Sequence, residues 1–264
     1  MTAPAMRSLV AGLGLAVTLL VSTACGSSAD TIDVYGASSL TELLRELGEA
    51  FEREDGEANV RFSFASSSAL ATQIRQGAPA DVYISANPTL TGALAEEGYV
   101  EASQLIASTR MVIVARSDDD TVATLSHLGD ANVILVLAGE GVPAGDYARD
   151  VLSNASIADG LGDGFRERVL ANVRSFEPNV RAALLKVELG EADAAIVYDT
   201  DVDPRNSRLR TVAVPDEYNV VATFAAALLI DADGGARAFY DFLASEAAAE
   251  IIRSFGFDSL RYAD

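Results

Sequence analysis

The sequence predicts an α/β fold built from successive strand–helix units, and two observations support this prediction. Short runs with the apolar pattern of strands are repeatedly followed by segments with apolar residues at helical spacing. In the first two units, serines fill the break between the two patterns, within residues 37–39 and 66–68. Strand-to-helix turns of neighbouring parallel units meet at the carboxyl edge of a sheet. We therefore expect both serine turns to lie at one ligand crevice.

The first two units show the pattern most clearly. Residues 31–36 are expected as a strand, and the helix that follows carries its apolar side chains on one face. Ser39 and Glu42 at the start of this helix fit a capping box. Residues 60–64 alternate as a second strand before the next helix. A serine at a helix start is also an ordinary N-cap, so each serine turn has a structural explanation beside the functional one.

The same alternation continues to the end of the chain. Further strands are expected at residues 81–86, 111–115, 133–138, 194–198, 209–214 and 220–230. Helices are expected from Pro88 to Gly98, from about Asp146, over 165–173, from about Glu177 and within 235–255. The Gly- and Pro-rich turn at 139–145 can bring backbone amides close to a ligand. Residues 153–164 are expected as a surface loop.

The first 24 residues are expected to be a signal peptide outside the fold. Arg7 supplies a positive charge, residues 9–21 form an apolar run too short for a membrane span, and small residues precede Cys25. This pattern is similar to a bacterial lipobox, in which the cysteine is lipidated and becomes the first mature residue. Plain secretion with an unmodified cysteine is the alternative. Either way we expect an extracytoplasmic protein, anchored outside the cytoplasmic membrane or periplasmic. Disulfides are not expected, because Cys25 is the only cysteine.

The charge of the chain is strongly acidic. Nineteen Lys and Arg residues oppose 39 Asp and Glu residues, which gives a net charge of −20 over 264 residues. Loss of Arg7 with the leader makes the mature value 18 − 39 = −21. This balance argues against nucleic acid and against electrostatic binding to anionic lipid. A small anionic ligand stays open, because short-range hydrogen bonds in a dry cleft can outweigh a screened surface field.

Catalytic and metal-binding patterns are mostly missing from the sequence. The single histidine, His127, lies in a polar turn, and the single lysine, Lys186, forms no Ser-x-x-Lys motif. Residues 36–40 lack the last glycine of a nucleophile elbow. No cysteine pair or second histidine offers metal-ligand spacing. We therefore expect a protein that is not an enzyme and has no cofactor. The enzymatic alternative is a secreted serine hydrolase acting through Ser38 or Ser39.

Six segments of the chain carry a resemblance to a known family. They are Val34–Thr41, Ser63–Ser68, Gly77–Ala86, Val142–Gly145, Val180–Leu184 and Ile196–Tyr198, followed by Ala238–Leu243 and Phe255–Phe257. In this order they resemble the periplasmic molybdate-binding proteins of ABC transporters. The resemblance implies a two-lobed periplasmic-binding-protein fold of type II, each lobe a mainly parallel sheet flanked by helices. The chain would cross between lobes twice. Lobe 1 would comprise residues 30–110 plus 222–264 and lobe 2 residues 111–221, with a hinge near Arg110 and Ala222.

The resemblance also implies a site and a function. The ligand contacts of the family fall on Ser39, Ser67, Ala144, Val180 and Tyr198. Ser38 beside Ser39 leaves open which hydroxyl points inward. Neutral hydroxyls and amides would surround a tetrahedral dianion, with molybdenum bound only as the oxyanion. The implied function is capture of molybdate, and of tungstate with it, by a monomer that delivers it to an ABC permease. The alternative ligands are sulfate, phosphate or another small anion.

Overall fold

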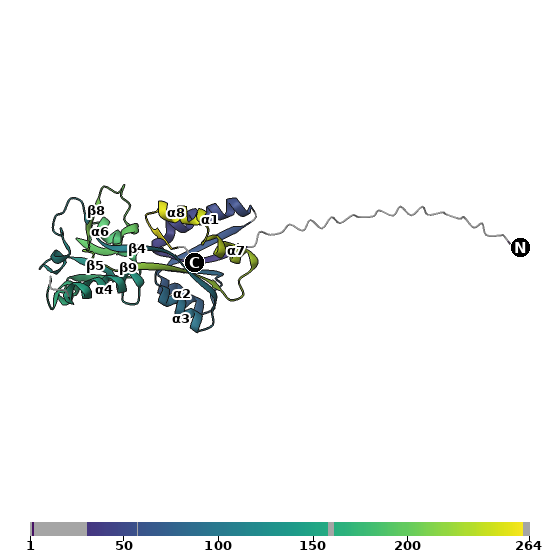
Figure 1. The fold of residues 1–264 in the computed structure, drawn as a ribbon, viewed down its shortest axis with the longest axis horizontal. Coiled ribbons are helices and arrows are strands. Elements are labelled where there is room, and N and C mark those ends of the chain that lie inside the picture. The colour runs from purple at the N-terminus through teal and green to yellow at the C-terminus, as the bar shows by residue number, and fades with distance from the viewer. Residues whose placement is uncertain (1, 3–30, 57, 158–160, 261–264) are drawn as a thin grey trace.

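The computed structural model describes Thr2 and residues 31–56, 58–157 and 161–260. Apart from Thr2, the expected signal peptide lies outside the described residues, and so does Cys25. Two groups of helices and strands lie side by side, and the long strands β4 (Val100–Arg116) and β9 (Val221–Leu229) run through both (Figure 1). The α/β class expected from the sequence is confirmed. None of the helices in the described part of the chain has the length and apolarity that a membrane crossing requires.

The first group, called half A here, is built on three parallel strands in the order β2-β1-β3. Its strands are β1 (Thr31–Ala37), β2 (Asn59–Ala65) and β3 (Val82–Ser85). Its helices are α1 (Thr41–Asp55), α2 (Ser67–Arg75), α3 (Pro88–Glu96), α7 (Gly234–Phe242) and α8 (Glu246–Ser254). A 3₁₀ turn, η1 (Ser38–Leu40), leads into α1. The apolar face of α1 is buried, as its periodicity predicts.

The second group, called half B, repeats this plan with parallel strands in the order β7-β5-β6. Its strands are β5 (Leu135–Ala138), β6 (Val173–Glu177), β7 (Ala194–Tyr198) and β8 (Leu209–Ala213). Its helices are α4 (Pro143–Ile157), α5 (Phe165–Ala171) and α6 (Val180–Glu188), with 3₁₀ turns η2 (Leu125–Gly129) and η3 (Asp199–Asp201). The buried strands β5 and β7 are apolar at nearly every position because both of their faces are covered.

The strands β4 and β9 join the two halves. They pair antiparallel from Val100 opposite Leu229 to Arg110 opposite Val221. From Met111 onward β4 pairs instead with β7 and β8 of half B, again antiparallel. The short strand β10 (Asp258–Ser259) also pairs with β4. The pairing is therefore mixed, parallel in the outer strands and antiparallel in the middle. The lobe boundaries expected from the sequence stay a prediction.

Three expected segments differ in the structure. Strand β4 begins at Val100 and not at residue 111, and the other two differences lie in half B. Helix α4 begins at Pro143 and continues to Ile157, so residues 153–157 are helical and the loop expected there is wrong. Ser153 and Ser156 suggest a loop by their type, but their hydroxyls donate to carbonyls four residues earlier and so fit a helix. Helix α5 ends at Ala171, and an unexpected edge strand, β6, pairs with β5.

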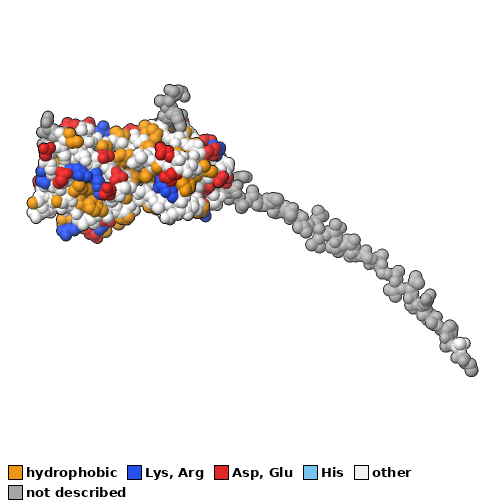
Figure 2. All heavy atoms as spheres, turned by 90° about the horizontal axis from the view of Figure 1, so that it is seen from below, with side chains coloured by type: hydrophobic (Ala, Val, Ile, Leu, Met, Phe, Trp, Pro, Cys, Tyr) orange, Lys and Arg blue, Asp and Glu red, His pale blue; other side chains and the backbone are white. Residues whose placement is uncertain are grey.

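Charged side chains cover the surface in mixed groups. Figure 2 shows basic side chains beside acidic ones on the face that it presents. Exposed ion pairs such as Arg61 with Asp33 and Arg75 with Glu97 are typical of this surface. Such pairs contribute little to stability, because water and salt screen them.

Candidate ligand-binding pocket

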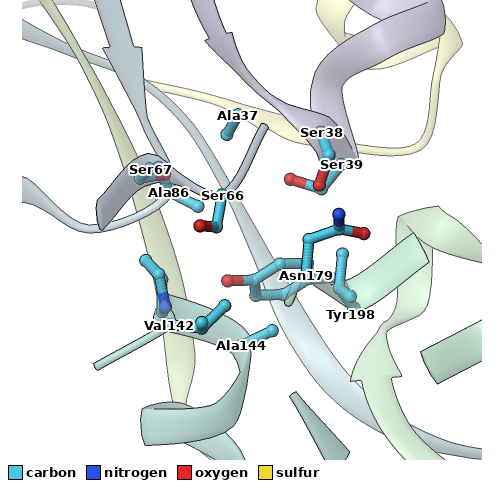
Figure 3. Close-up of a pocket in the computed structure, with 12 residues that line it drawn as sticks. Ala37, Ser38, Ser39, Ser66, Ser67, Ala86, Val142, Ala144, Asn179 and Tyr198 are labelled. Carbon is cyan, nitrogen blue, oxygen red and sulfur yellow. Dashed lines mark hydrogen bonds between the residues drawn. The ribbon is translucent and has the colours of Figure 1, made fainter. Parts of the chain in front are cut away.

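A small pocket lies between halves A and B (Figure 3). It is lined by Ala37, Ser38, Ser39, Ser66, Ser67 and Ala86 of half A and by Val142, Pro143, Ala144, Asn179, Val180 and Tyr198 of half B. The five residues that the family resemblance points to are all among them. The pocket is small: it encloses about 200 Å³, and this value includes space open to solvent. Its size therefore favours a small ligand.

Helices from both halves begin at this pocket. In half A these are η1 with α1, from Ser38, and α2, from Ser67; in half B they are α4, from Pro143, and α6, from Val180. The first N–H groups of a helix have no carbonyl acceptor within it, and the helix dipole is positive at this end. None of the described residues that line the pocket is charged. The pocket is therefore a neutral site that favours an anion.

The second serine turn divides capping and pocket roles between neighbouring residues. Ser66 is the N-cap of α2, and its Oγ accepts a hydrogen bond from the N–H of Ala69 at 3.4 Å. Ser67 is buried, and its Oγ accepts the N–H of Ala86 at 2.9 Å. The hydroxyl of Tyr83 donates to the Ser67 carbonyl at 2.8 Å and fixes the turn. Because the Ser67 oxygen accepts from Ala86, its O–H is left to donate to a ligand.

The first serine turn does not form the capping box expected for Ser39 and Glu42. The chain makes the 3₁₀ turn η1 before α1 begins, so Leu40 stands at the N-cap of α1 and provides no side-chain cap. Thr41 Oγ1 instead donates to the Ser38 carbonyl at 2.7 Å. Ser38 and Ser39 both line the pocket, and Ser39 is the more buried of the two. The extra turn moves Ser39 from a capping position to the wall of the pocket.

The start of α6 presents backbone N–H groups in half B. Asn179 is the N-cap, and its Oδ1 accepts the N–H of Ala182 at 3.0 Å. The N–H of Val180 lies at the first helical position, where no carbonyl of the helix can reach it. Asn179 also lines the pocket, although the sequence did not single it out as a site residue. An Asn before an apolar helical face is the N-cap signal that predicts this helix start.

The start of α4 approaches the end of β5 closely because residue 145 is a glycine. A Cβ atom at Gly145 would lie 2.2 Å from the carbonyl oxygen of Gly139 and 2.3 Å from that of Ala138. Gly141 has φ +75°, and its N–H donates to Asp146 Oδ1 at 2.9 Å. These contacts place Ala144 in the first helical turn at the pocket. The glycine-rich turn thus allows close backbone packing, and the expected approach of its amides to a ligand stays a prediction.

Tyr198 carries the most informative polar atom of the pocket. It ends β7, is 1% exposed, and its ring packs edge-on against Phe224 and Tyr147. Figure 3 shows its hydroxyl pointing into the pocket, between the serine turns and the turn of Val142 and Ala144. This buried hydroxyl has no hydrogen-bond partner among the described residues. Burial raises the pKa of Tyr198 well above its ordinary value, so the phenol is a neutral donor.

A buried carboxylate lies near the pocket, three residues after Tyr198. The side chain of Asp201 is fully buried, and its Oδ1 forms an ion pair with Arg181 Nε at 3.1 Å. Burial raises the pKa of Asp201 to about 7, against the opposing effect of the Arg181 charge. Neither residue lines the pocket. Sequence reasoning missed the pair, because Asp199-Thr-Asp201 after a strand is typical of an exposed turn.

The same geometry bears on the enzymatic and metal-binding alternatives. His127 lies in η2 and does not line the pocket, and its Nδ1 accepts the N–H of Ala123 at 3.0 Å. Ser38 and Ser39 therefore have no histidine base. No group of three or more His, Cys, Asp or Glu side chains in the described ranges is placed to hold a metal ion. The described residues that line the pocket include no carboxylate, thiolate or imidazole, the usual metal ligands, and its hydroxyls and N–H groups can donate to an anion.

Comparison with known proteins identifies related sequences and folds. The family described as bacterial extracellular solute-binding protein matches residues 32–258. Molybdate-binding protein ModA of Escherichia coli (strain K12) is 30% identical over 236 residues, covering 86% of this chain and 88% of that protein. The solved periplasmic molybdate-binding protein of Azotobacter vinelandii matches with a TM-score of 0.72 and 19% identity, over 86% and 98% of the two chains. The sulfate-binding protein SubI of Mycobacterium tuberculosis H37Rv matches with a TM-score of 0.77 and 16% identity, over 88% of each chain.

Proposed function

The chain belongs to the family of bacterial extracellular solute-binding proteins, and from this premise we propose that its solute is molybdate. Its relatives are solute-binding proteins of ABC transporters and not enzymes, and its fold is the two-lobed type II fold of such proteins. The ligand would bind in the pocket between halves A and B. The E. coli relative named as a molybdate-binding protein, similar over most of both chains, supports this choice of solute.

The observation that carries the proposal is the unpartnered hydroxyl of Tyr198. A buried polar group without a partner costs about 1–3 kcal/mol, so native structures rarely keep one without a reason. Here it is a neutral donor that points into a pocket where four helices begin and no lining residue is charged. A ligand that completes this site must supply an acceptor for the Tyr198 hydroxyl and for the N–H groups at the helix starts. A fully deprotonated tetrahedral dianion meets that requirement.

Discrimination among oxyanions would depend on size and protonation. Molybdate has longer element–oxygen bonds than sulfate, so donors set for molybdate would hold sulfate with stretched hydrogen bonds, which are weaker. Phosphate at neutral pH often carries a proton, which needs an acceptor, and the backbone N–H groups at the helix starts of the pocket cannot supply one. Sulfate is the second candidate, because a sulfate-binding protein shares the fold. At 16% identity that likeness concerns the fold alone.

Three finer features belong to the same proposal. Tungstate would bind as molybdate does, because hydrogen-bond donors around an anion respond to its size and charge and not to the identity of its central metal. The protein would deliver its ligand, as a monomer, to an ABC permease. Cys25 would be lipidated and would anchor the chain outside the cytoplasmic membrane. Support for the anchor is the lipobox-like sequence around this single cysteine.

A thermal-shift panel of molybdate, tungstate, sulfate and phosphate tests the solute directly. A ligand that binds only the folded state stabilises it by about 2.7 kcal/mol at 100 times its Kd. We expect a large rise in Tm with molybdate and tungstate and a small rise with sulfate at the same concentration. Tyr198→Phe is the matched control, since it removes one oxygen that has no partner in the described residues. A rise with sulfate equal to that with molybdate would overturn the assignment.

The lipid anchor is tested separately in the native host. Wild-type protein should partition into detergent with the membrane fraction, whereas Cys25→Ser should be released or left unprocessed. An acyl anchor supplies hydrophobic binding that an acidic surface cannot. Recovery of unmodified, soluble wild-type protein would rule the anchor out and leave the ligand assignment untouched.

A further inference from the structure

One arginine connects halves A and B next to the pocket. Arg181 is the second residue of α6 in half B and follows Val180, which lines the pocket. Its guanidinium contacts Glu42 of α1 in half A, with Nη1 3.4 Å from Oε1 and Nη2 in contact with Oε2. Both α1, through η1, and α6 begin at the pocket. The contact therefore joins two walls that belong to different halves.

On its own side the guanidinium forms an ion pair with Asp201, in which the two nearest atoms are close but not aligned as a hydrogen bond. The Asp201 carboxyl group is fully buried, and Arg181 Nε lies 3.1 Å from its Oδ1. The Arg181 side chain is 33% exposed and Glu42 is 54% exposed, so the pair between the halves is open to water while the pair within half B is not. An arginine fixed at one end by a buried partner loses less side-chain entropy when it binds a second carboxylate. Asp201 thus prepares Arg181 for Glu42.

We propose that Arg181 is a positioning residue for ligand retention: held by Asp201, it binds Glu42 and ties α6 to α1 across the closed pocket. This inference rests on the proposed function of the pocket as an anion site. A ligand held by both halves leaves only when the halves separate, and separation breaks the pair of Arg181 and Glu42. The pair therefore slows ligand release and leaves capture unchanged.

Simple electrostatics makes the opposite prediction for Glu42. A carboxylate beside an anion site repels the anion, so replacing Glu42 with a neutral residue should tighten binding if charge alone matters. If the ion pair of Arg181 and Glu42 holds the two halves together, the same substitution should instead weaken binding. The sign of the change thus separates the two explanations.

The test compares Glu42→Gln with Glu46→Gln by stopped-flow binding of molybdate. Glu46 lies on the same helix and pairs with Arg53 of that helix, so its substitution removes the same charge without touching half B. For Glu42→Gln we expect the dissociation rate to rise about two- to five-fold, the range for an exposed ion pair, with an unchanged association rate. Glu46→Gln should match wild type. Unchanged or slower dissociation in Glu42→Gln would overturn the inference.

A ligand-free measurement distinguishes failure of the tie from failure of the proposed function. If wild-type protein binds no molybdate, the proposed function fails, and hydrogen exchange without ligand still tests the tie. Glu42→Gln should then speed exchange of the N–H groups at the start of α6 relative to Glu46→Gln. Equal exchange in the two variants would contradict the tie whatever the ligand is. Unfolding in denaturant should give the same free energy of unfolding for the two variants. Faster exchange in Glu42→Gln would then reflect separation of halves A and B and not a loss of overall stability.

Discussion

The two halves of the pocket offer an anion different kinds of donor. Half A presents side-chain hydroxyls, Ser39 and Ser67, at its helix starts. Half B presents backbone N–H groups at the helix starts of Ala144 and Val180, together with one hydroxyl, that of Tyr198. A hydroxyl donor can be recognised in a sequence and removed by one substitution. A backbone donor depends on where a helix begins, so its residue type carries no signal. The substitutions below test whether both kinds of donor bind the ligand.

The largest effect is expected at Tyr198, whose hydroxyl lies at the half B side of the pocket. Tyr198→Phe should weaken molybdate binding by about 1.5–3 kcal/mol, the range for a hydrogen bond to a charged partner. Isothermal titration measures this loss. Stability without ligand should not fall, because the hydroxyl has no partner among the described residues. Unchanged affinity would remove Tyr198 from the site.

A backbone donor of half B can be removed at Val180. Proline is tolerated at the first helical position, and Asn179 before it is extended (φ −161°, ψ 171°), as a residue before proline should be. Val180→Pro deletes the N–H and should cost roughly 1.5 kcal/mol of molybdate affinity, the lower end of the range for a charged partner. Val180→Ala is the matched control, since it trims the side chain and keeps the N–H. Equal affinities for the two variants would show that this N–H binds no ligand.

The serines of half A should differ from each other. Ser67→Ala removes the acceptor of the buried Ala86 N–H and should cost about 1–3 kcal/mol of stability together with roughly 1 kcal/mol of affinity. Ser39→Ala should cost roughly 0.5–1 kcal/mol of affinity and little stability, because no hydrogen bond of its hydroxyl is found within the described residues. Chemical denaturation and titration of both variants measure these differences. Equal stability losses would contradict the distinct role of Ser67.

Substitution of Asp201 is expected to change ligand affinity least, because this residue does not line the pocket. Its expected effect is on the pH dependence of folding stability. Burial raises its pKa from 3.8 to about 7, so between these values the folded protein keeps a proton that the unfolded chain has released. Stability should therefore fall as pH rises through this window and stay lower above it.

Denaturant unfolding at about pH 5 and about pH 8 checks the role of Asp201. Asp201→Asn should flatten the fall in stability between these two values, because an amide does not titrate. Asp199→Asn, a neighbouring exposed site, is the control and should keep the wild-type slope. Identical slopes in wild type and Asp201→Asn would show that Asp201 does not titrate in this window.

The sequence predicts the fold where local patterns suffice. The strands that end at Ala37 and Tyr198 and the buried face of α1 follow from periodicity alone. The length of β4 does not, because residues 100–110 become a strand only through pairing with β9, more than a hundred residues later. The structure brings the five expected site residues together, and their binding role stays a prediction. The pair of Arg181 and Asp201 was not predictable, since it depends on burial of a polar turn.

A crystal structure of the molybdate complex tests the central claim, that neutral donors from both halves hold the anion. We predict molybdate oxygens within about 2.7–3.2 Å of the Ser39, Ser67 and Tyr198 hydroxyls and of the N–H groups at Ala144 and Val180. No lysine or arginine side chain should touch the anion. Molybdate bound outside this pocket, or held there by the Arg181 guanidinium, would contradict the account.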